Sequence, residues 1–139
     1  MVIEFINDQE WGIDTPPFAP LIERLQGAID CYEGILNVVF VTDAYIQSLN
    51  KSYMDKDEPT DVLSFNYRDE KTGGTDDLVG EIYISVETAK KQAKENRCDL
   101  MDELKKLFAH GFLHIHGYDH DDDNDYKKMT ELEKKILSS

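Results

Sequence analysis

The chain has 139 residues, of which 29 are acidic and 15 basic, so its formal net charge is −14. Hydrophobic residues make up 40% of the sequence, which is enough for a folded core and excludes a disordered acidic tail. The length predicts a single domain over residues 1–139. The charge disfavours general electrostatic capture of nucleic acid, because phosphate is repelled unless basic residues gather on one face.

We expect neither export nor membrane insertion from the sequence. The first ten residues include three acidic and no basic ones, and no apolar run approaches the roughly 18 residues that span a bilayer. We therefore expect a cytoplasmic protein. Cys31 and Cys98 lack metal-site or redox-motif spacing, and we expect both to be free, partly buried thiols.

Strand and helix patterns alternate through the first half of the chain. Residues 1–6 are β-prone, and helical spacing of apolar residues follows over 18–29, after two prolines. The β-branched segment 35–41 predicts a second strand. Thr42 is placed to cap a helix that contains Tyr45, Ile46 and Leu49.

The second half has two strand patterns followed by helices. Segments 62–67 and 78–84 flank an acidic loop with Gly73-Gly74 and predict antiparallel strands joined by a mobile connection. Ser85 is placed to cap a helix to about Arg97, and Asp99 to cap the next one. A terminal helix is indicated by the spacing of Tyr126, Met129, Leu132 and Ile136.

This order predicts an α+β fold: a mixed sheet of about four strands packed with about five helices.

All four histidines lie within residues 110–120, in the segment HGFLHIHGYDH. On a helix, His110 and His114 are about 40° apart around the axis and about 6 Å apart along it, so both imidazoles can face one ion. Gly117 can end the helix in a left-handed conformation, and the chain can then return His120 to the same ion. The three residues predict a site for one divalent metal. Zinc is the usual assignment for such a site, and imidazole ligands alone would also accept nickel or copper.

The spacing of these histidines matches the zinc-protease pattern H-E-x-x-H-x-x-G-x-x-H, with one difference. Gly111 stands where that pattern has its general-base glutamate, which argues against peptide hydrolysis by the protease mechanism. Three histidines and a fourth position for water describe a catalytic type of metal site. His116 would point about 200° away from His114 around the helix, and we expect it not to bind the metal.

Five aspartates between residues 119 and 125 suggest a calcium loop, but the required glycine and glutamate are replaced by Asn124 and Thr130. We interpret these aspartates as a solvated helix N-terminus. Asp119 is either a hydrogen-bond partner for the ligand His120 or a simple turn residue.

The segment HGFLHIHGYDH resembles the signature HGxLHxxGYDH of the YbeY family of bacterial ribosomal-RNA maturation endoribonucleases, at every fixed position. The segments KDEPTDVLSF (56–65) and GEIYIS (80–85) resemble two further family motifs. The resemblance implies a metal-dependent enzyme that cuts single-stranded RNA in small-subunit rRNA maturation and ribosome quality control. Its implied partners are single-stranded rRNA and the small ribosomal subunit, with no role for DNA or membranes, and its implied metal ligands are His110, His114 and His120.

The chain departs from the family pattern at two positions. Met54 stands where family members usually have an arginine taken to contact RNA, and Glu81 replaces a common aspartate. Methionine cannot pair with phosphate. Lys56 and Arg68, with Lys51, are the nearest basic candidates for RNA contact, and a second basic group is formed by Lys90, Lys94 and Arg97 on one predicted helical face.

Two alternatives to an endoribonuclease remain open from the sequence. One is a metallohydrolase of another class, such as a metallopeptidase, using the same three histidines. The other is a non-catalytic ribosome-assembly factor, which the acidic charge and Met54 favour.

Overall fold

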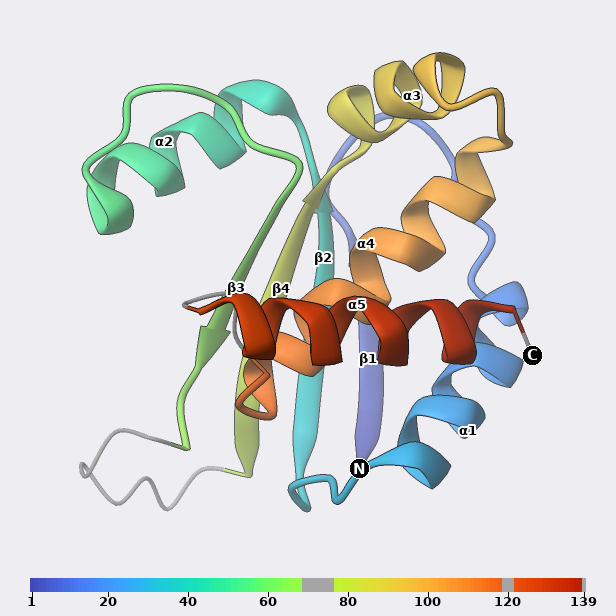
Figure 1. The fold of residues 1–139 in the computed structure, drawn as a ribbon. Coiled ribbons are helices and arrows are strands. Elements are labelled where there is room, and N and C mark those ends of the chain that lie inside the picture. The colour runs from blue at the N-terminus through green and yellow to red at the C-terminus, as the bar shows by residue number, and fades with distance from the viewer. Residues whose placement is uncertain (69–76, 119–121, 139) are drawn as a thin grey trace.

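The computed structural model describes residues 1–68, 77–118 and 122–138 and follows the predicted order of elements (Figure 1). Its sheet has the order β1-β2-β4-β3, and the strands are β1 (Val2–Asn7), β2 (Ile35–Val41), β3 (Val62–Asn66) and β4 (Leu78–Ser85). β2 pairs in parallel with β1 and β4, while β3 is antiparallel to β4. The predicted mixed sheet and antiparallel pair are confirmed, whereas the Gly73-Gly74 loop lies outside the described residues.

The helices begin close to the predicted caps. They are the short 3₁₀ helix η1 (Pro16–Phe18) and the α-helices α1 (Ala19–Ala28), α2 (Asp43–Met54), α3 (Val86–Glu95), α4 (Leu100–Ile115) and α5 (Asp123–Leu137). The hydroxyl oxygens of Thr42 and Ser85 accept hydrogen bonds from backbone N–H groups in the first turns of α2 and α3. Asp99 precedes α4 as predicted, but its side chain makes no capping hydrogen bond; its backbone carbonyl accepts from Glu103 instead.

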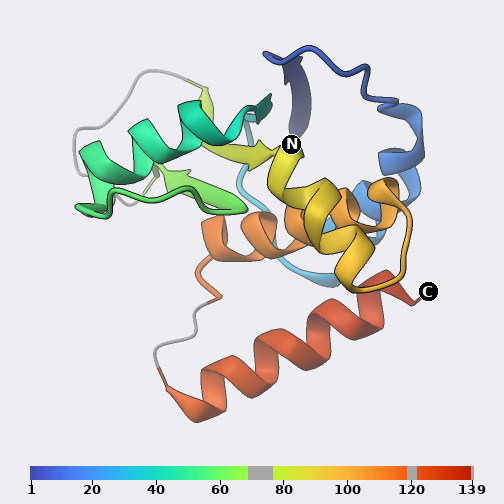
Figure 2. The same ribbon diagram turned by 90° about the horizontal axis from the view of Figure 1, so that it is seen from above.

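The main core lies between the sheet and α4. Phe18, Phe40, Phe108 and Phe112 are fully buried there, and the rings of Phe18 and Phe108 meet edge to face with centroids 5.7 Å apart. Figure 2 shows α4 and α5 on one side of the sheet and α2 on the other. The histidine-bearing helix is therefore held by a large apolar contact along its inner face.

A smaller core lies under α2 on the opposite face of the sheet. Ile46 of α2 is buried against Val39 and Val41 of β2, with Leu63 and Tyr83 packed beside them. The alternation of side chains along β2 explains the two cores, because successive residues of a strand point to opposite faces. No helix among the described residues is long and apolar enough to cross a bilayer.

Candidate metal centre

His110 and His114 lie one turn apart near the C-terminal end of α4. Their ring centroids are 4.8 Å apart with an angle of 67° between the planes, and both side chains are half-buried. The structure thus brings two of the predicted ligands together on one helical face. Among the described residues no three potential ligands surround one ion, and His120 and Asp119 lie outside those residues.

Glu133 of α5 contacts His110 directly. The distance from its Oε1 to Nδ1 of His110 is 2.7 Å. Since an ionised carboxylate only accepts hydrogen bonds, the Nδ1–H group donates and the lone pair of the neutral ring is on Nε2. This is the arrangement typical of a metal-binding histidine whose other nitrogen is held by a carboxylate.

The sequence analysis missed Glu133, although the sequence contains a signal for it. Glu133 is four residues after Met129 and three before Ile136, both buried, so it lies on the apolar stripe of α5. A carboxylate on an apolar stripe requires a partner, because burying an unpaired charge is costly. That argument identifies Glu133 as a candidate, but it does not identify His110 as the partner.

His116 has contacts that suit a structural residue. Its Nδ1–H donates to the carbonyl oxygen of Phe112 at 2.8 Å, and its Nε2 accepts from the backbone N–H of Tyr32 at 3.3 Å. The ring also stacks on Tyr32 with centroids 5.1 Å apart. Burial lowers the pKa of His116 and so favours the neutral ring. The hydrogen bond to the carbonyl of Phe112 acts in the opposite direction and is the smaller effect.

Gly117 ends the helix in the predicted left-handed conformation, with φ of +93°. Its N–H donates to the carbonyl of His114, and the N–H of Tyr118 donates to that of Leu113, which closes the last turn. On the other side of residues 119–121, the carboxylate of Asp122 accepts from the N–H of Asp125 and caps α5. This cap supports the helix-terminus interpretation of the aspartates.

Two contacts fix the end of α4 against the sheet. The side-chain amide of Asn66 in β3 donates to the carbonyl oxygen of Ile115 at 2.7 Å. A Cβ atom on Gly111 would lie 2.9 Å from Cγ2 of Ile82, so the helix backbone approaches β4 too closely for a side chain. A protease-like glutamate at position 111 therefore does not fit this packing.

Comparisons with known proteins identify the family of this chain. A family model described as Endoribonuclease YbeY matches residues 7–139. The chain belongs to the endoribonuclease YbeY family. Two relatives named Endoribonuclease YbeY are those of Treponema denticola, 41% identical over 97% of this chain and 89% of the relative, and of Acholeplasma laidlawii, 42% identical over 99% and 96%.

A solved structure supports the fold of this YbeY-family chain. It is the solution structure of TM1509 from Thermotoga maritima, with a TM-score of 0.64 and 29% identity over 99% of this chain and 87% of that one. The expected family and fold class are thus confirmed. The names of the relatives also make this chain a member of a nuclease family, as the motifs predicted.

The basic candidates for RNA contact are in unlike surroundings. Met54, the last residue of α2, has 54% of its surface exposed, and Lys56 follows it as an exposed residue of the loop before β3. Arg68 follows β3, and its guanidinium donates to the carbonyl oxygen of Glu33 at 2.7 Å. Lys56 is therefore presented to solvent, whereas Arg68 ties two parts of the fold together.

The second basic group does not form the predicted helical face. Helix α3 ends at Glu95, and Arg97 lies beyond it with a left-handed φ of +55°. The Nζ atom of Lys90 lies 4.6 Å from the ring centroid of Trp11. The face is broken because the helix stops before its last basic member.

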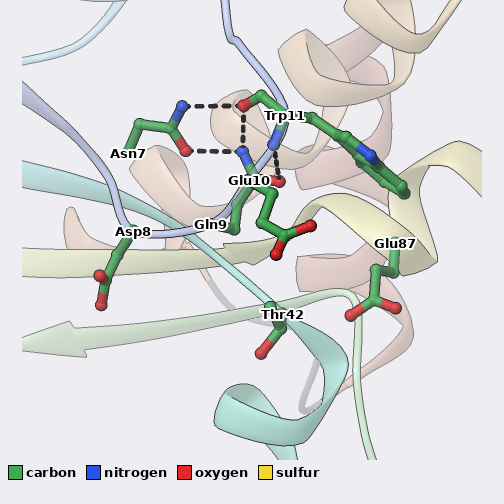
Figure 3. A pocket seen from close by; sticks show the side chains of 7 residues that line it. All are labelled: Asn7, Asp8, Gln9, Glu10, Trp11, Thr42 and Glu87. Atoms are coloured by element: carbon green, nitrogen blue, oxygen red, sulfur yellow. Dashed lines mark hydrogen bonds between the residues drawn. The ribbon is translucent and has the colours of Figure 1, made fainter.

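A cavity of about 570 Å³ lies at the end of β1 and does not include the histidines (Figure 3). The side-chain amides of Asn7 and Gln9 donate to the carbonyl oxygen of Trp11 beside it. Its lining includes three acidic side chains, and the full set is Asn7, Asp8, Gln9, Glu10, Trp11, Thr42 and Glu87. This lining does not suit phosphate, because its ionisable groups are all carboxylates.

Proposed function

We propose that this protein is a metal-dependent endoribonuclease that cuts single-stranded RNA in small-subunit rRNA maturation and ribosome quality control. The observation that carries the proposal is the pair His110 and His114 on one face of α4, within the family's signature segment. The relatives' shared name supports the reaction class. The proposed partners are single-stranded rRNA and the small ribosomal subunit, which would place the protein in the cytoplasm.

The residues present fit a divalent metal, and Zn²⁺ suits a three-imidazole donor set. His110 and His114 would hold it with His120, and the hydrogen bond from His110 to Glu133 would leave the lone pair of Nε2 of His110 for the metal. When bound, the ion would supply Lewis acidity toward the scissile phosphate and activate water for attack. The chain contributes the orientation of the ligands, through the helix α4 and the carboxylate of Glu133.

Lys56 is the stronger candidate for phosphate contact. Its side chain is exposed on the loop between α2 and β3, two residues after the position where the family usually has its arginine. Arg68 is the weaker candidate, because reaching RNA would cost its hydrogen bond to Glu33. Asp119 stays a proposed partner of His120.

The two alternatives are less well supported. A metallopeptidase of the zinc-protease type needs a glutamate at position 111, where a Cβ atom alone would crowd Ile82. A non-catalytic assembly factor is favoured by the net charge of −14 and by Met54. In that case the metal would only tie the end of α4 to the following turn.

A cleavage assay on a single-stranded rRNA precursor fragment tests the proposal. The metal-free protein, the Zn²⁺-loaded protein and His114→Ala should be compared, with the metal content of each measured by elemental analysis. We expect one metal per chain and cutting by the loaded protein alone, while His114→Ala loses both. Casein cleavage would favour the metallopeptidase, and tight binding to the small subunit without cutting would favour the assembly factor.

A further inference from the structure

We propose that Glu133 is a positioning residue of the metal centre. It holds the ring of His110 in the tautomer protonated at Nδ1, and its negative charge strengthens Nε2 as a donor to the metal. This inference rests on the proposed metal site. It also assigns a role to α5, which carries none of the three predicted ligands.

The contact has the geometry of a charge-assisted hydrogen bond. The distance from Nδ1 to Oε1 is 2.7 Å, within the range for an N–H donor and an ionised carboxylate. The side chains of His110 and Glu133 are 29% and 17% exposed, so the pair is partly shielded from water. Shielding strengthens the interaction and limits competition from solvent.

The position of Glu133 is set by contacts that do not involve the histidine. Met129 and Ile136 of α5 are buried in the main core. The carbonyl oxygen of Ile136 accepts a hydrogen bond from Nε of Arg24 in α1 at 2.8 Å. Because these contacts fix α5 on both sides of Glu133, the carboxylate is held in place before any metal arrives.

Metal binding by His110 depends on the tautomer of its ring. A neutral imidazole in water favours the proton on Nε2, which would block that nitrogen as a ligand. An anionic acceptor at Nδ1 reverses the preference and also sets the rotation of the ring. Glu133 thus presents a lone pair on Nε2 of His110, at a histidine whose ring centroid lies 4.8 Å from that of His114.

Helix α5 also links the two ends of the predicted ligand set. It begins at Asp123, three residues after His120 in the sequence. Glu133, ten residues further along the helix, contacts His110, the first of the predicted ligands. Displacing α5 would therefore disturb the orientation of His110 as well as the chain that leads from His120. We infer that the packing of α5 and the affinity for metal are coupled.

Metal affinity provides the first test. Zn²⁺ binding is measured by competition with a chromophoric chelator for the wild type, for Glu133→Gln, and for Glu131→Gln as a matched control on an exposed position of the same helix. Loss of such a partner typically weakens metal binding about 10- to 100-fold, and we expect this for Glu133→Gln. The control should bind Zn²⁺ like the wild type.

The tautomer of His110 provides a test without metal. Metal-free protein with ¹⁵N-labelled histidine is studied by NMR at about pH 8, above the ordinary histidine pKa. We expect the Nδ1–H form in the wild type, a larger share of the Nε2–H form in Glu133→Gln, whose neutral amide can either accept or donate at Nδ1, and the Nε2–H form in Glu133→Ala. Unfolding curves of the metal-free variants show whether Glu133→Ala is folded, and Glu133→Gln carries the affinity test if it is not.

The failures of the two proposals differ. If the wild type binds no Zn²⁺, the proposed metal site is wrong, and this inference falls with it. If the wild type binds Zn²⁺ and Glu133→Gln binds it equally well, the proposed function stands and the role of Glu133 is overturned. An unchanged tautomer in folded Glu133→Ala would also overturn it.

Discussion

At the scale of single residues, the described histidines of the signature segment divide into two kinds. His110 and His114 lie beside each other on α4, with Glu133 holding the first. Both ring nitrogens of His116 contact the backbone, one at Phe112 and one at Tyr32. The difference follows from helix geometry, because residues four apart share a face and residues two apart do not.

His116→Ala should leave the metal content unchanged and lower the stability. The substitution removes two hydrogen bonds and the stacking on Tyr32 at a half-buried position. Each lost hydrogen bond typically costs about 0.5–1.5 kcal/mol, so the free energy of unfolding should fall by roughly 1–3 kcal/mol. Urea unfolding and elemental analysis measure the two effects, and loss of stoichiometric metal would show that His116 is a ligand.

At the scale of elements, the close approach of α4 to β4 shapes the candidate site. Gly111 allows it, since even a methyl group there would lie 2.9 Å from the buried side chain of Ile82. The contact brings the backbone of the histidine-bearing turns onto the sheet, while Asn66 ties the end of the helix to β3. The absence of a glutamate at this position is therefore a packing requirement as well as a chemical difference.

Gly111→Ala should destabilise the protein relative to a matched control. Replacing a helical glycine by alanine improves the helix propensity by about 1 kcal/mol, at position 111 and at the control position 27 alike. At position 111 the added methyl group also overpacks the core, at a typical cost of about 1–3 kcal/mol. Gly27→Ala in α1 is the control, because a Cβ atom there meets nothing within 4 Å. Urea unfolding should show Gly111→Ala less stable than Gly27→Ala by roughly 1–3 kcal/mol, and equal stabilities would contradict the packing argument.

Two tyrosines beside Glu81 of β4 should make the protein less stable in alkali. Burial and then the nearby Glu81 carboxylate raise the pKa of Tyr83 to about 12, and burial and the hydrogen bond to Glu81 also raise that of Tyr67. A tyrosine ionises more readily in the unfolded chain, near pH 10, so this stabilisation is complete below pH 10 and is lost as the pH rises toward 12.

Unfolding curves between pH 8 and 12 would measure this loss. We expect the midpoint of urea unfolding to fall above pH 10, and to fall less steeply in Tyr83→Phe. Tyr126→Phe is the control, because Tyr126 is an exposed residue of α5. A wild-type midpoint that does not change up to pH 12 would contradict the argument.

At the scale of the whole molecule, the proposed function requires an acidic protein to bind an acidic polymer. The net charge of −14 opposes RNA binding at long range. Arg97 lies beyond α3, so the predicted basic face is not formed. The guanidinium of Arg68 donates a hydrogen bond to the backbone carbonyl of Glu33. In the proposed function, local contacts near the end of α2 therefore have to supply the attraction. Lys56 and Lys51 are both exposed there, and the Nζ atom of Lys51 lies 3.9 Å from the carboxylate of Asp57.

Met54→Arg should tighten RNA binding if the usual arginine contact has been lost. One added phosphate contact steepens the slope of log affinity against log salt by about 0.7 for a single strand. The salt dependence of binding to a single-stranded oligoribonucleotide measures this slope. If Met54→Arg leaves the slope unchanged while Lys56→Ala or Arg68→Ala flattens it by about 0.7, the contact has moved to that neighbour and the RNA site is not weakened.

Much of this protein could be predicted from its sequence because the relevant signals are local. The period of apolar residues located the helices and strands, including the range 35–41 and the caps Thr42 and Ser85. The spacing of His110 and His114 placed them on one face, since 3.6 residues per turn depends on nothing outside the helix. The turn at Gly117 likewise followed from the freedom of glycine to adopt a positive φ.

Only the tertiary structure decided the contacts between distant segments. It placed Glu133 against His110 across 23 positions of sequence, Ile82 against Gly111, and the Arg68 guanidinium on the carbonyl of Glu33. It also placed β4 between β2 and β3. No periodicity encodes such pairings, because they depend on how separate elements pack into one core, and a residue's own neighbours in the chain do not determine which distant side chain it meets.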